Sequence, residues 1–315
     1  MIMKKITLLI LSFLTLNSFS QNFSGEIEYK YSIIPKEKSQ YIDSIMELNK
    51  DVKINYLITD SFYKSTKYNE GEYVYSYTYD NISKRMYDDY ADRAYITYRD
   101  SRKANYEYYG STILKDSTEV ISGLNCFLVK YDSEFGDSKS YYSDKIKVNY
   151  ESFKDHKIGN WYEKLKEVDG SISIKNITEY EKYAEVRKAV KITEKPLGSN
   201  YFELPKDKII VASYPALDKK VELIQPTKEQ IELYQRQIKK ASENLNDGEN
   251  YICYLSFVLT KKGEVKYVEA YKEGSSYFDE KAVEIFTACN FDFSPGVIDG
   301  RKVSSQTYFP IEFKR

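Results

Sequence analysis

Residues 251–271 read YICYLSFVLTKKGEVKYVEAY and set the architecture of the last part of the chain. Every second residue of the first half is apolar: Cys253, Leu255, Phe257 and Leu259. That period is typical of a strand with one buried face. The Lys-Lys-Gly sequence at 261–263 places a glycine where a hairpin turn needs a positive φ. The stretch therefore predicts two antiparallel strands, 251–260 and 264–271.

Two helices and a last strand flank this hairpin. Thr227 and Gln230 form a capping-box pattern that begins a helix ending near residues 246–248. Its apolar residues recur at helical spacing: Ile231, Tyr234, Ile238, Ala241 and Leu245. A second helix, Ser276–Cys289, carries the apolar stripe Phe278, Ala282, Ile285, Phe286 and Cys289. With a strand at Val303–Phe313, the predicted order is α-β-β-α-β.

Residues 226–315 resemble the TonB C-terminal domain family. The similarity lies in Phe257–Val265, in Phe278–Ala282 and in the closing Phe309–Phe313. The resemblance implies a small α+β domain whose last strand binds an extended peptide of an outer-membrane receptor by strand addition. We expect the partner-binding side chains to point outward: Ser304, Gln306 and Tyr308. Those at alternate positions should pack inward: Val303, Ser305, Thr307, Phe309, Ile311 and Phe313.

Two features differ from a complete TonB energy transducer. Such a protein keeps its N-terminal helix in the inner membrane and crosses the periplasm with a proline-rich rod. The whole chain has only 7 prolines, and a β-rich segment stands in place of the rod. The C-terminal domain is therefore interpreted as a binding module rather than a transmitter of force.

Residues 21–205 predict a β-rich domain. Short runs alternate apolar and polar residues, which is the pattern of half-buried strands: 27–33, 52–58, 73–79, 94–98, 127–131, 139–143, 172–177 and 184–193. A helix is expected at 37–48. Close spacing with few helices favours an antiparallel sheet that is curled or forms a half-barrel. Residues 206–225 are expected to be a connector.

The same segment resembles the GLPGLI family of exported proteins. The similar stretches are Phe23–Tyr29, Ile121–Val129, Tyr141–Ile146 and Tyr201–Pro205. The resemblance implies a relative of the half-barrels that carry lipoproteins through the periplasm. The Gly-Leu-Pro-Gly-Leu-Ile stretch that names the family is missing, and Lys157–Tyr162 stands in its place.

The first twenty residues, MIMKKITLLILSFLTLNSFS, have the pattern of a secretory signal peptide. Lys4 and Lys5 precede an apolar run, and Ser18 and Ser20 occupy the −3 and −1 positions of a cleavage site. The run is short of the roughly 20 apolar residues of a membrane-spanning helix. We expect a processed protein in the periplasm or associated with the envelope, which does not span the membrane; an uncleaved anchor is the alternative.

Composition excludes several functional classes. The 315 residues include 47 Lys and Arg against 48 Asp and Glu, a balance that argues against a nucleic-acid partner. The single histidine, His156, lies in a charged loop and is expected at the surface. We expect no catalytic residues, no metal and no cofactor. A weak calcium site at Asp88, Asp89 and Asp92 is the alternative reading of that acidic cluster.

The three cysteines are expected to be small buried side chains. An odd number leaves at least one of them unpaired. Cys253 shares a face with the apolar positions of its strand, and Cys289 lies on the apolar stripe of its helix. We therefore expect both in one helix–sheet core, where a disulfide between them is the alternative to two free thiols.

The sequence thus predicts a non-catalytic exported envelope protein that binds a protein or peptide partner through its C-terminal domain, with a link to outer-membrane transport. The alternative is a periplasmic carrier or sensor of a lipid-like or apolar ligand in the β-rich domain. The chain has 33 tyrosines, which either pack across strands or form an aromatic wall for such a ligand. An open edge strand supports the first function, and an internal cavity supports the second.

Overall fold

The computed structural model describes residues 22–271 and 276–315, so the predicted signal peptide lies outside the described residues. The chain forms two compact units. Their described parts are a β-rich unit, residues 22–84 and 101–203, and a C-terminal unit, residues 85–100 and 204–315 without the gap. In the described part of the chain, no helix is long and apolar enough to cross a membrane.

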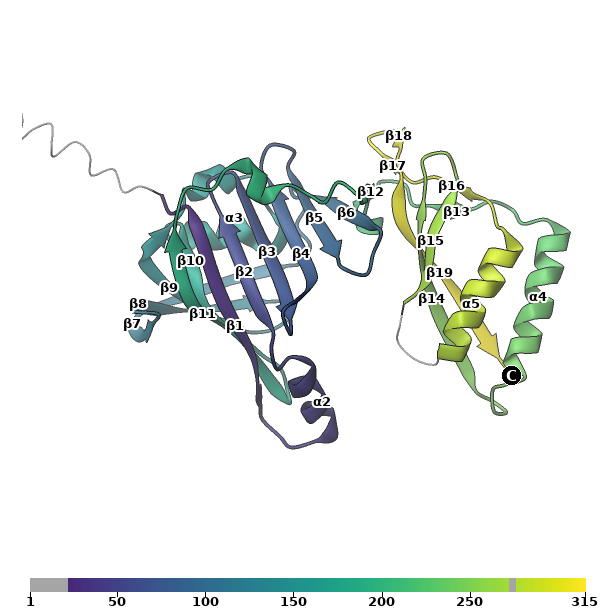
Figure 1. Ribbon diagram of the computed structural model, residues 1–315, viewed down its shortest axis with the longest axis horizontal. Helices are drawn as coiled ribbons and strands as arrows, with labels where there is room; N and C mark the ends of the chain where they lie inside the picture. Colours follow the sequence, from purple (N-terminus) through teal and green to yellow (C-terminus); the bar gives the residue numbers. More distant parts are fainter. Residues whose placement is uncertain (1–21, 272–275) are drawn as a thin grey trace, which may run out of the picture. The chain divides into compact units, whose positions relative to one another are not determined.

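The β-rich unit is built on one antiparallel sheet (Figure 1). Its strands are β1 (Gly25–Pro35), β2 (Lys53–Ile58), β3 (Phe62–Asn69), β4 (Glu72–Asp80), β7 (Tyr108–Ile121), β8 (Leu124–Ser133), β9 (Ser138–Lys147), β10 (Ser171–Glu179) and β11 (Tyr183–Glu194). The order in the unit is β4-β3-β2-β1-β11-β10-β9-β8-β7. The sheet curls without closing, which confirms the predicted curled antiparallel architecture.

Short helices accompany this sheet: α2 (Gln40–Leu48), η1 (Tyr150–Phe153), η2 (Ile158–Asn160), α3 (Trp161–Glu167) and η3 (Ser199–Phe202). The register shifts by bulges between Glu28 and Tyr29 on β1 and between Leu114 and Thr118 on β7. A bulge bends a strand and increases its twist, so these irregularities help the sheet to curl. Helix α3 covers the concave face, where Leu165 is buried.

The C-terminal unit adds strands to the predicted α-β-β-α-β order, which is confirmed. Its elements are β5 (Arg85–Tyr90), β6 (Tyr95–Asp100), β12 (Ile209–Ala212), η4 (Tyr214–Ala216), β13 (Glu222–Leu223), α4 (Lys228–Ser242), β14 (Asn250–Leu259), β15 (Val265–Ala270), α5 (Ser276–Cys289), β16 (Phe293–Ser294), β17 (Val297–Ile298), β18 (Arg301–Lys302) and β19 (Ser305–Lys314). Neighbours in its main sheet are β15-β14-β19-β12-β6-β5. Strand β14 is antiparallel to both β15 and β19, and β12 is parallel to β6.

Residues 206–225, expected to be a connector, contain β12 and β13, and β12 pairs with β6 over Ile209–Ala212. The hairpin at residues 85–100 also belongs to the C-terminal unit. The expected division near residue 205 into independently folding domains stays a prediction.

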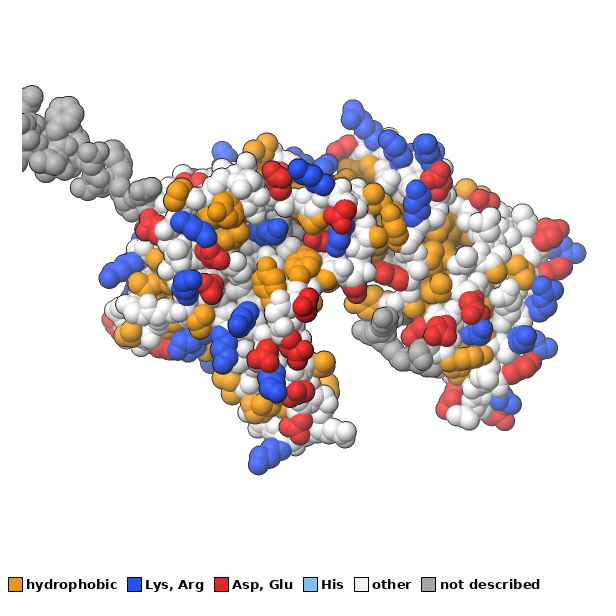
Figure 2. Space-filling model, in the orientation of Figure 1, with side chains coloured by type: hydrophobic (Ala, Val, Ile, Leu, Met, Phe, Trp, Pro, Cys, Tyr) orange, Lys and Arg blue, Asp and Glu red, His pale blue; other side chains and the backbone are white. Residues whose placement is uncertain are grey.

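Helices α4 and α5 pack on one face of the C-terminal sheet. The predicted capping box of α4 is present, with Thr227 Oγ1 accepting from the N–H of Gln230 at 3.2 Å and Gln230 Oε1 accepting from the N–H of Thr227 at 2.9 Å. Charged side chains follow the outer face of α4 in Figure 2. The inner faces of both helices contact aromatic side chains of the sheet. Phe257 on β14 is fully buried, and its ring centroid lies 4.9 Å from that of Phe286 on α5.

Truncating Phe257 should create a cavity in this core. We expect Phe257→Ala to lower the free energy of unfolding by about 3–5 kcal/mol, because the surrounding rings collapse only partly into the space. Urea unfolding followed by circular dichroism measures the change. Tyr254→Ala is the matched control, since Tyr254 lies on the same strand and is 52% exposed. Equal effects of both changes would contradict the assignment of the core.

Candidate functional site

The last strand, β19, has one paired edge and one edge that is largely open. Its inner edge pairs with β14 from Ser305 to Lys314. On the outer side β12 pairs only at Ser305, where the N–H of Ala212 donates to the carbonyl of Ser304 at 2.9 Å. Among the described residues, no strand pairs with that side of β19 beyond this point. The predicted edge is therefore occupied by the chain itself at its beginning and open further on.

The hydrogen bond from Ala212 fixes which backbone groups face the open edge. Successive residues of a strand direct their N–H and C=O groups to opposite neighbours. Since the Ser304 carbonyl points to β12, the even-numbered residues Tyr308, Pro310 and Glu312 present their backbone to the outer edge. Pro310 thus removes no hydrogen bond from the ladder with β14, which explains how a proline fits within a long strand.

The three side chains predicted to bind a partner occupy different environments. Tyr308 is 41% exposed, as expected. Ser304 is partly buried, and its Oγ accepts from the N–H of Lys261 at 3.0 Å. Gln306 is only 4% exposed, so the expectation that its side chain points into solvent is wrong. The inward positions Ser305, Thr307, Ile311 and Phe313 are buried, and Phe309 is partly buried.

Gln306 is buried because the hairpin of β5 and β6 covers the face of the sheet opposite the helices. Its Nε2 donates to Tyr95 Oη at 3.3 Å and to Ser256 Oγ at 3.1 Å. The Tyr95 hydroxyl also donates to Glu269 Oε1 at 3.3 Å, and Arg93 lies 3.6 Å from the same oxygen. This polar network joins β6, β14, β15 and β19, and alternation along β19 alone gives no sign of it.

A second candidate site is a cavity of about 200 Å³ on the concave side of the β-rich unit. Its lining comes from the sheet and from α3, and contains Tyr29, Tyr56, Tyr77, Tyr131, Ser138, Ser140, Tyr142, Gly159, Trp161, Lys164, Leu165, Ser171, Ile172, Ser173, Asn176 and Arg187. Burial raises the pKa of the Tyr56 phenol well above its usual value and that of Tyr142 to about 12. These phenols therefore stay protonated near neutral pH.

An aromatic cluster stands beside the cavity and contains the single histidine. His156 is fully buried, so the expectation of a surface histidine is wrong. Its ring stacks on Tyr79 with centroids 4.0 Å apart, and Nε2 lies 2.5 Å from the Tyr63 hydroxyl. The Trp161 ring centroid is 5.2 Å from that of Tyr63. These contacts give His156 a packing role and hold Trp161 against the sheet.

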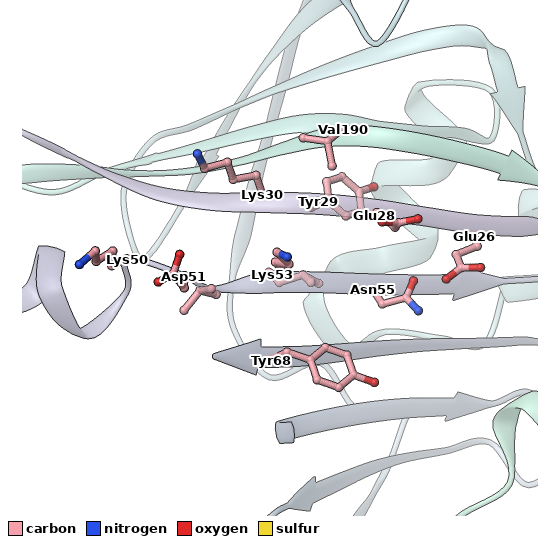
Figure 3. A pocket seen from close by; sticks show the side chains of 12 residues that line it. Glu26, Glu28, Tyr29, Lys30, Lys50, Asp51, Lys53, Asn55, Tyr68 and Val190 are labelled. Atoms are coloured by element: carbon pink, nitrogen blue, oxygen red, sulfur yellow. The ribbon is translucent and has the colours of Figure 1, made fainter. Parts of the chain in front are cut away.

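A wider hollow of about 550 Å³ lies over the opposite face of β1 and β2 (Figure 3). Its labelled side chains include charges of both signs on β1 and β2 and Tyr68 on β3. Glu28 pairs with Lys191 at 2.9 Å, and Glu26 pairs with Lys195. Because these carboxylates are neutralised locally and the charges are mixed, the hollow has the character of a solvated sheet face.

Two carboxylates of the acidic cluster on the β5–β6 hairpin form ion pairs with different cationic side chains. Asp88 lies 3.1 Å from Arg99, Asp89 lies 2.8 Å from Lys208, and Asp92 is exposed. Among the residues that the structure describes, no three His, Cys, Asp or Glu side chains are grouped so as to hold a metal ion. Nothing in this arrangement supports the calcium alternative.

Comparisons with known proteins agree with the description of the C-terminal unit. Residues 247–315 match the family model described as Gram-negative bacterial TonB protein C-terminal. This segment begins just before β14 and ends with β19, so it contains the hairpin, α5 and the open edge. The resemblance inferred from residues 257–265 and 309–313 is confirmed, and the C-terminal unit contains a domain of this type.

Among solved structures, the chain is similar to a LolA superfamily protein from Nitrosomonas europaea. The two share 7% sequence identity, and the match covers 58% of this chain and 91% of the other with a TM-score of 0.29. No match to the chain was found among curated proteins.

The reactivity of the three cysteine thiols tests whether the hydrophobic cores of both units bury them. Cys253 and Cys289 lie in the same hydrophobic cluster of the C-terminal unit, as expected, and both are free thiols. Burial and the neighbouring Asp279 carboxylate raise the pKa of Cys253 to about 12, and burial also raises the pKa of Cys126 and Cys289. The raised pKa of the Cys253 thiol therefore adds to the free energy of unfolding. This contribution is fully present below about pH 9 and is lost as the pH rises towards 12.

We expect almost no reaction of the folded protein with a thiol reagent at pH 8, because buried protonated thiols are poor nucleophiles. In urea, all 3 cysteines should react. Titration with Ellman's reagent with and without urea measures both numbers. A single reactive thiol in urea would instead reveal a disulfide and contradict the free thiols.

Proposed function

We propose that the protein is a non-catalytic component of the bacterial cell envelope whose C-terminal unit binds an extended peptide at the outer edge of β19. The observation that carries this proposal is the unoccupied backbone of Tyr308–Glu312, beyond the single pairing of β12 at Ser305. An exposed strand edge offers N–H and C=O groups to any matching chain. The family match to the TonB C-terminal type supports a partner from the same compartment, with a link to outer-membrane transport.

The geometry moves the centre of the proposed site towards the C-terminal end of β19. Backbone pairing would begin near Tyr308, whose exposed side chain could supply selectivity. Ser304 and Gln306 would act indirectly, because Ser304 binds β12 and Lys261 while Gln306 anchors the covering hairpin. The N–H of Lys314 is already bound by Ser242 Oγ at 3.1 Å, which limits the open segment at its other end.

Glu312 offers a sharp test of strand addition. Its N–H faces the open edge, so Glu312→Pro removes a donor for an added strand without removing one from the ladder with β14. Pro310 already occupies an equivalent position. We expect Glu312→Pro to lose partners captured from an envelope extract, while Glu312→Ala, which keeps the N–H, retains them.

Circular dichroism and thermal unfolding establish that both variants are folded before capture. The captured proteins are then identified by mass spectrometry for the wild type and both variants. Capture of the same partners by Glu312→Pro and by the wild type would rule out strand addition at this edge. Loss with both variants would assign the effect to the Glu312 side chain instead.

Export is a separate part of the proposal and has its own test. We expect cleavage after Ser20, because the charged head, apolar run and small residues form a signal-peptide pattern. N-terminal sequencing of the protein extracted from envelopes should begin at Gln21. An intact Met1 in the membrane fraction would restore the alternative of an uncleaved anchor.

A second candidate function is supported by the cavity of the β-rich unit. We propose that this unit binds a small, partly apolar ligand, in the role of carrier or sensor. The support is a hollow of about 200 Å³ whose lining combines the rings of five tyrosines and Trp161 with serine, asparagine, lysine and arginine side chains, rather than a fully packed concave face. An apolar cavity of about 150 Å³ in another protein is large enough to bind benzene, so the volume suits a compact ligand.

A further inference from the structure

We propose that the cavity of the β-rich unit binds a small amphipathic carboxylic acid, with its carboxylate on Arg187 and its apolar body against the tyrosine and tryptophan rings. The inference rests on the second function proposed above and narrows the chemistry of the ligand. It is independent of peptide binding by the C-terminal unit.

The cavity lining is positively charged. Two cationic side chains, Lys164 and Arg187, line the cavity, and the described lining contains no Asp or Glu. Neither cation forms an ion pair with a carboxylate in the described part of the chain. The acidic residue one turn along α3 is Glu167, and its Oε2 accepts from Tyr108 at 2.5 Å and Ser111 at 2.7 Å instead. A cavity with two cations and no acidic lining attracts an anion.

The guanidinium of Arg187 is held in place by its neighbours. Its Nε and Nη2 donate to Asn176 Oδ1 at 3.2 and 2.7 Å, and its guanidinium lies 4.7 Å from the centroid of Tyr29. Asn176 and Tyr29 therefore fix the plane of the guanidinium. Arginine carries five N–H groups, so donors remain for a ligand after these bonds and the contact with Tyr77. A held guanidinium is suited to a carboxylate.

Three side chains of the cavity lining carry hydrogen-bond donors that are not used within the described residues. Tyr56 Oη, Trp161 Nε1 and Ser171 Oγ are buried and have no hydrogen-bond partner in the described structure. All three belong to residues that line the cavity, and each can donate. A buried donor without an acceptor destabilises the free protein, because the hydrogen bond to water that is lost on folding is not replaced. A bound carboxylate would supply acceptors and has no hydrogens of its own to place.

The aromatic rings of the lining and the volume of the cavity determine which ligand body fits. The rings of Tyr29, Tyr56 and Trp161 form part of the lining, and the ring centroids of Tyr56 and Trp161 are 6.5 Å apart. The volume of about 200 Å³ leaves room for a ring or short chain beside the acid group and is small for a long acyl chain. An aromatic or short aliphatic monocarboxylate matches both the charge and the wall.

Trp161 provides the measurement, since it is the only tryptophan in the chain and lines the cavity. The full-length processed protein is titrated with benzoate, its neutral analogue benzamide, hexanoate and inorganic phosphate, and Trp161 fluorescence is followed. We expect a saturable response to benzoate or hexanoate. Benzamide should require at least about tenfold higher concentration, because it lacks the charge-assisted hydrogen bonds.

Two variants locate the acid group. Arg187→Met should weaken benzoate binding by about tenfold or more, whereas Lys188→Met, on the other face of the same strand, should leave it unchanged. Tyr56→Phe should weaken binding severalfold without lowering the thermal unfolding temperature, since the removed hydroxyl has no partner in the free protein. Tyr56→Phe keeps the test informative where loss of Arg187 disturbs folding.

Four other outcomes would each contradict a part of the proposed acid-binding site. Equal binding of benzamide and benzoate would overturn the anion site but leave a ligand-binding unit. Preference for inorganic phosphate over both carboxylates would overturn the amphipathic acid. Unchanged benzoate affinity in Arg187→Met would remove Arg187 from the site, and no response to any probe would overturn both the acid site and the second proposed function.

Discussion

The curl of the antiparallel sheet is the constraint on which the β-rich unit depends. A curled sheet encloses a concave face that one short helix, α3, covers only in part. Long side chains must fill the remaining space, and tyrosine does so with a ring that bears a hydroxyl at its end. Each ring that reaches inward therefore carries a polar atom into the interior. Tyr29 satisfies its hydroxyl with the carbonyl of Ser173 at 2.6 Å, and Tyr131 and Tyr142 bind each other at 2.7 Å.

The elements of the C-terminal unit could be predicted because their signals are local. The capping box at Thr227, the glycine turn at residue 263 and the alternation of 253–259 each act within a few residues. Helix α4 and the strands β14 and β15 follow from these signals, and α5 and β19 follow from the equally local apolar periodicity of residues 278–289 and 303–313. The pairing of β12 and the covering hairpin at residues 85–100 could not be predicted, since both join segments far apart in the sequence.

The same difference between local signals and distant contacts explains which features of the candidate sites could be predicted. Alternation correctly separates the two faces of β19, but it carries no information about what covers the second face, so it places Gln306 in solvent although the side chain is buried. Arg187 illustrates a different limit. Its neighbours Ala184 and Val186 are buried, and alternation from them places Arg187 on the other side of the strand. That side lines a cavity because the sheet curls around it and α3 covers it, and both depend on contacts between segments far apart in the sequence.

The membership of residues 85–100 in the C-terminal unit has a consequence for how such proteins are assembled from parts. The chain passes from one unit to the other three times, after residues 84, 100 and 203. A single cut near residue 205 would leave the C-terminal piece without Tyr95, and Gln306 and Ser256 would lose a buried partner. Gene fusion or recombination at one point near residue 205 therefore separates the hairpin from the rest of this unit. To keep the unit complete, residues 85–100 must be transferred together with residues 204–315, either as an insertion in the recipient protein or as a segment joined at a new chain end.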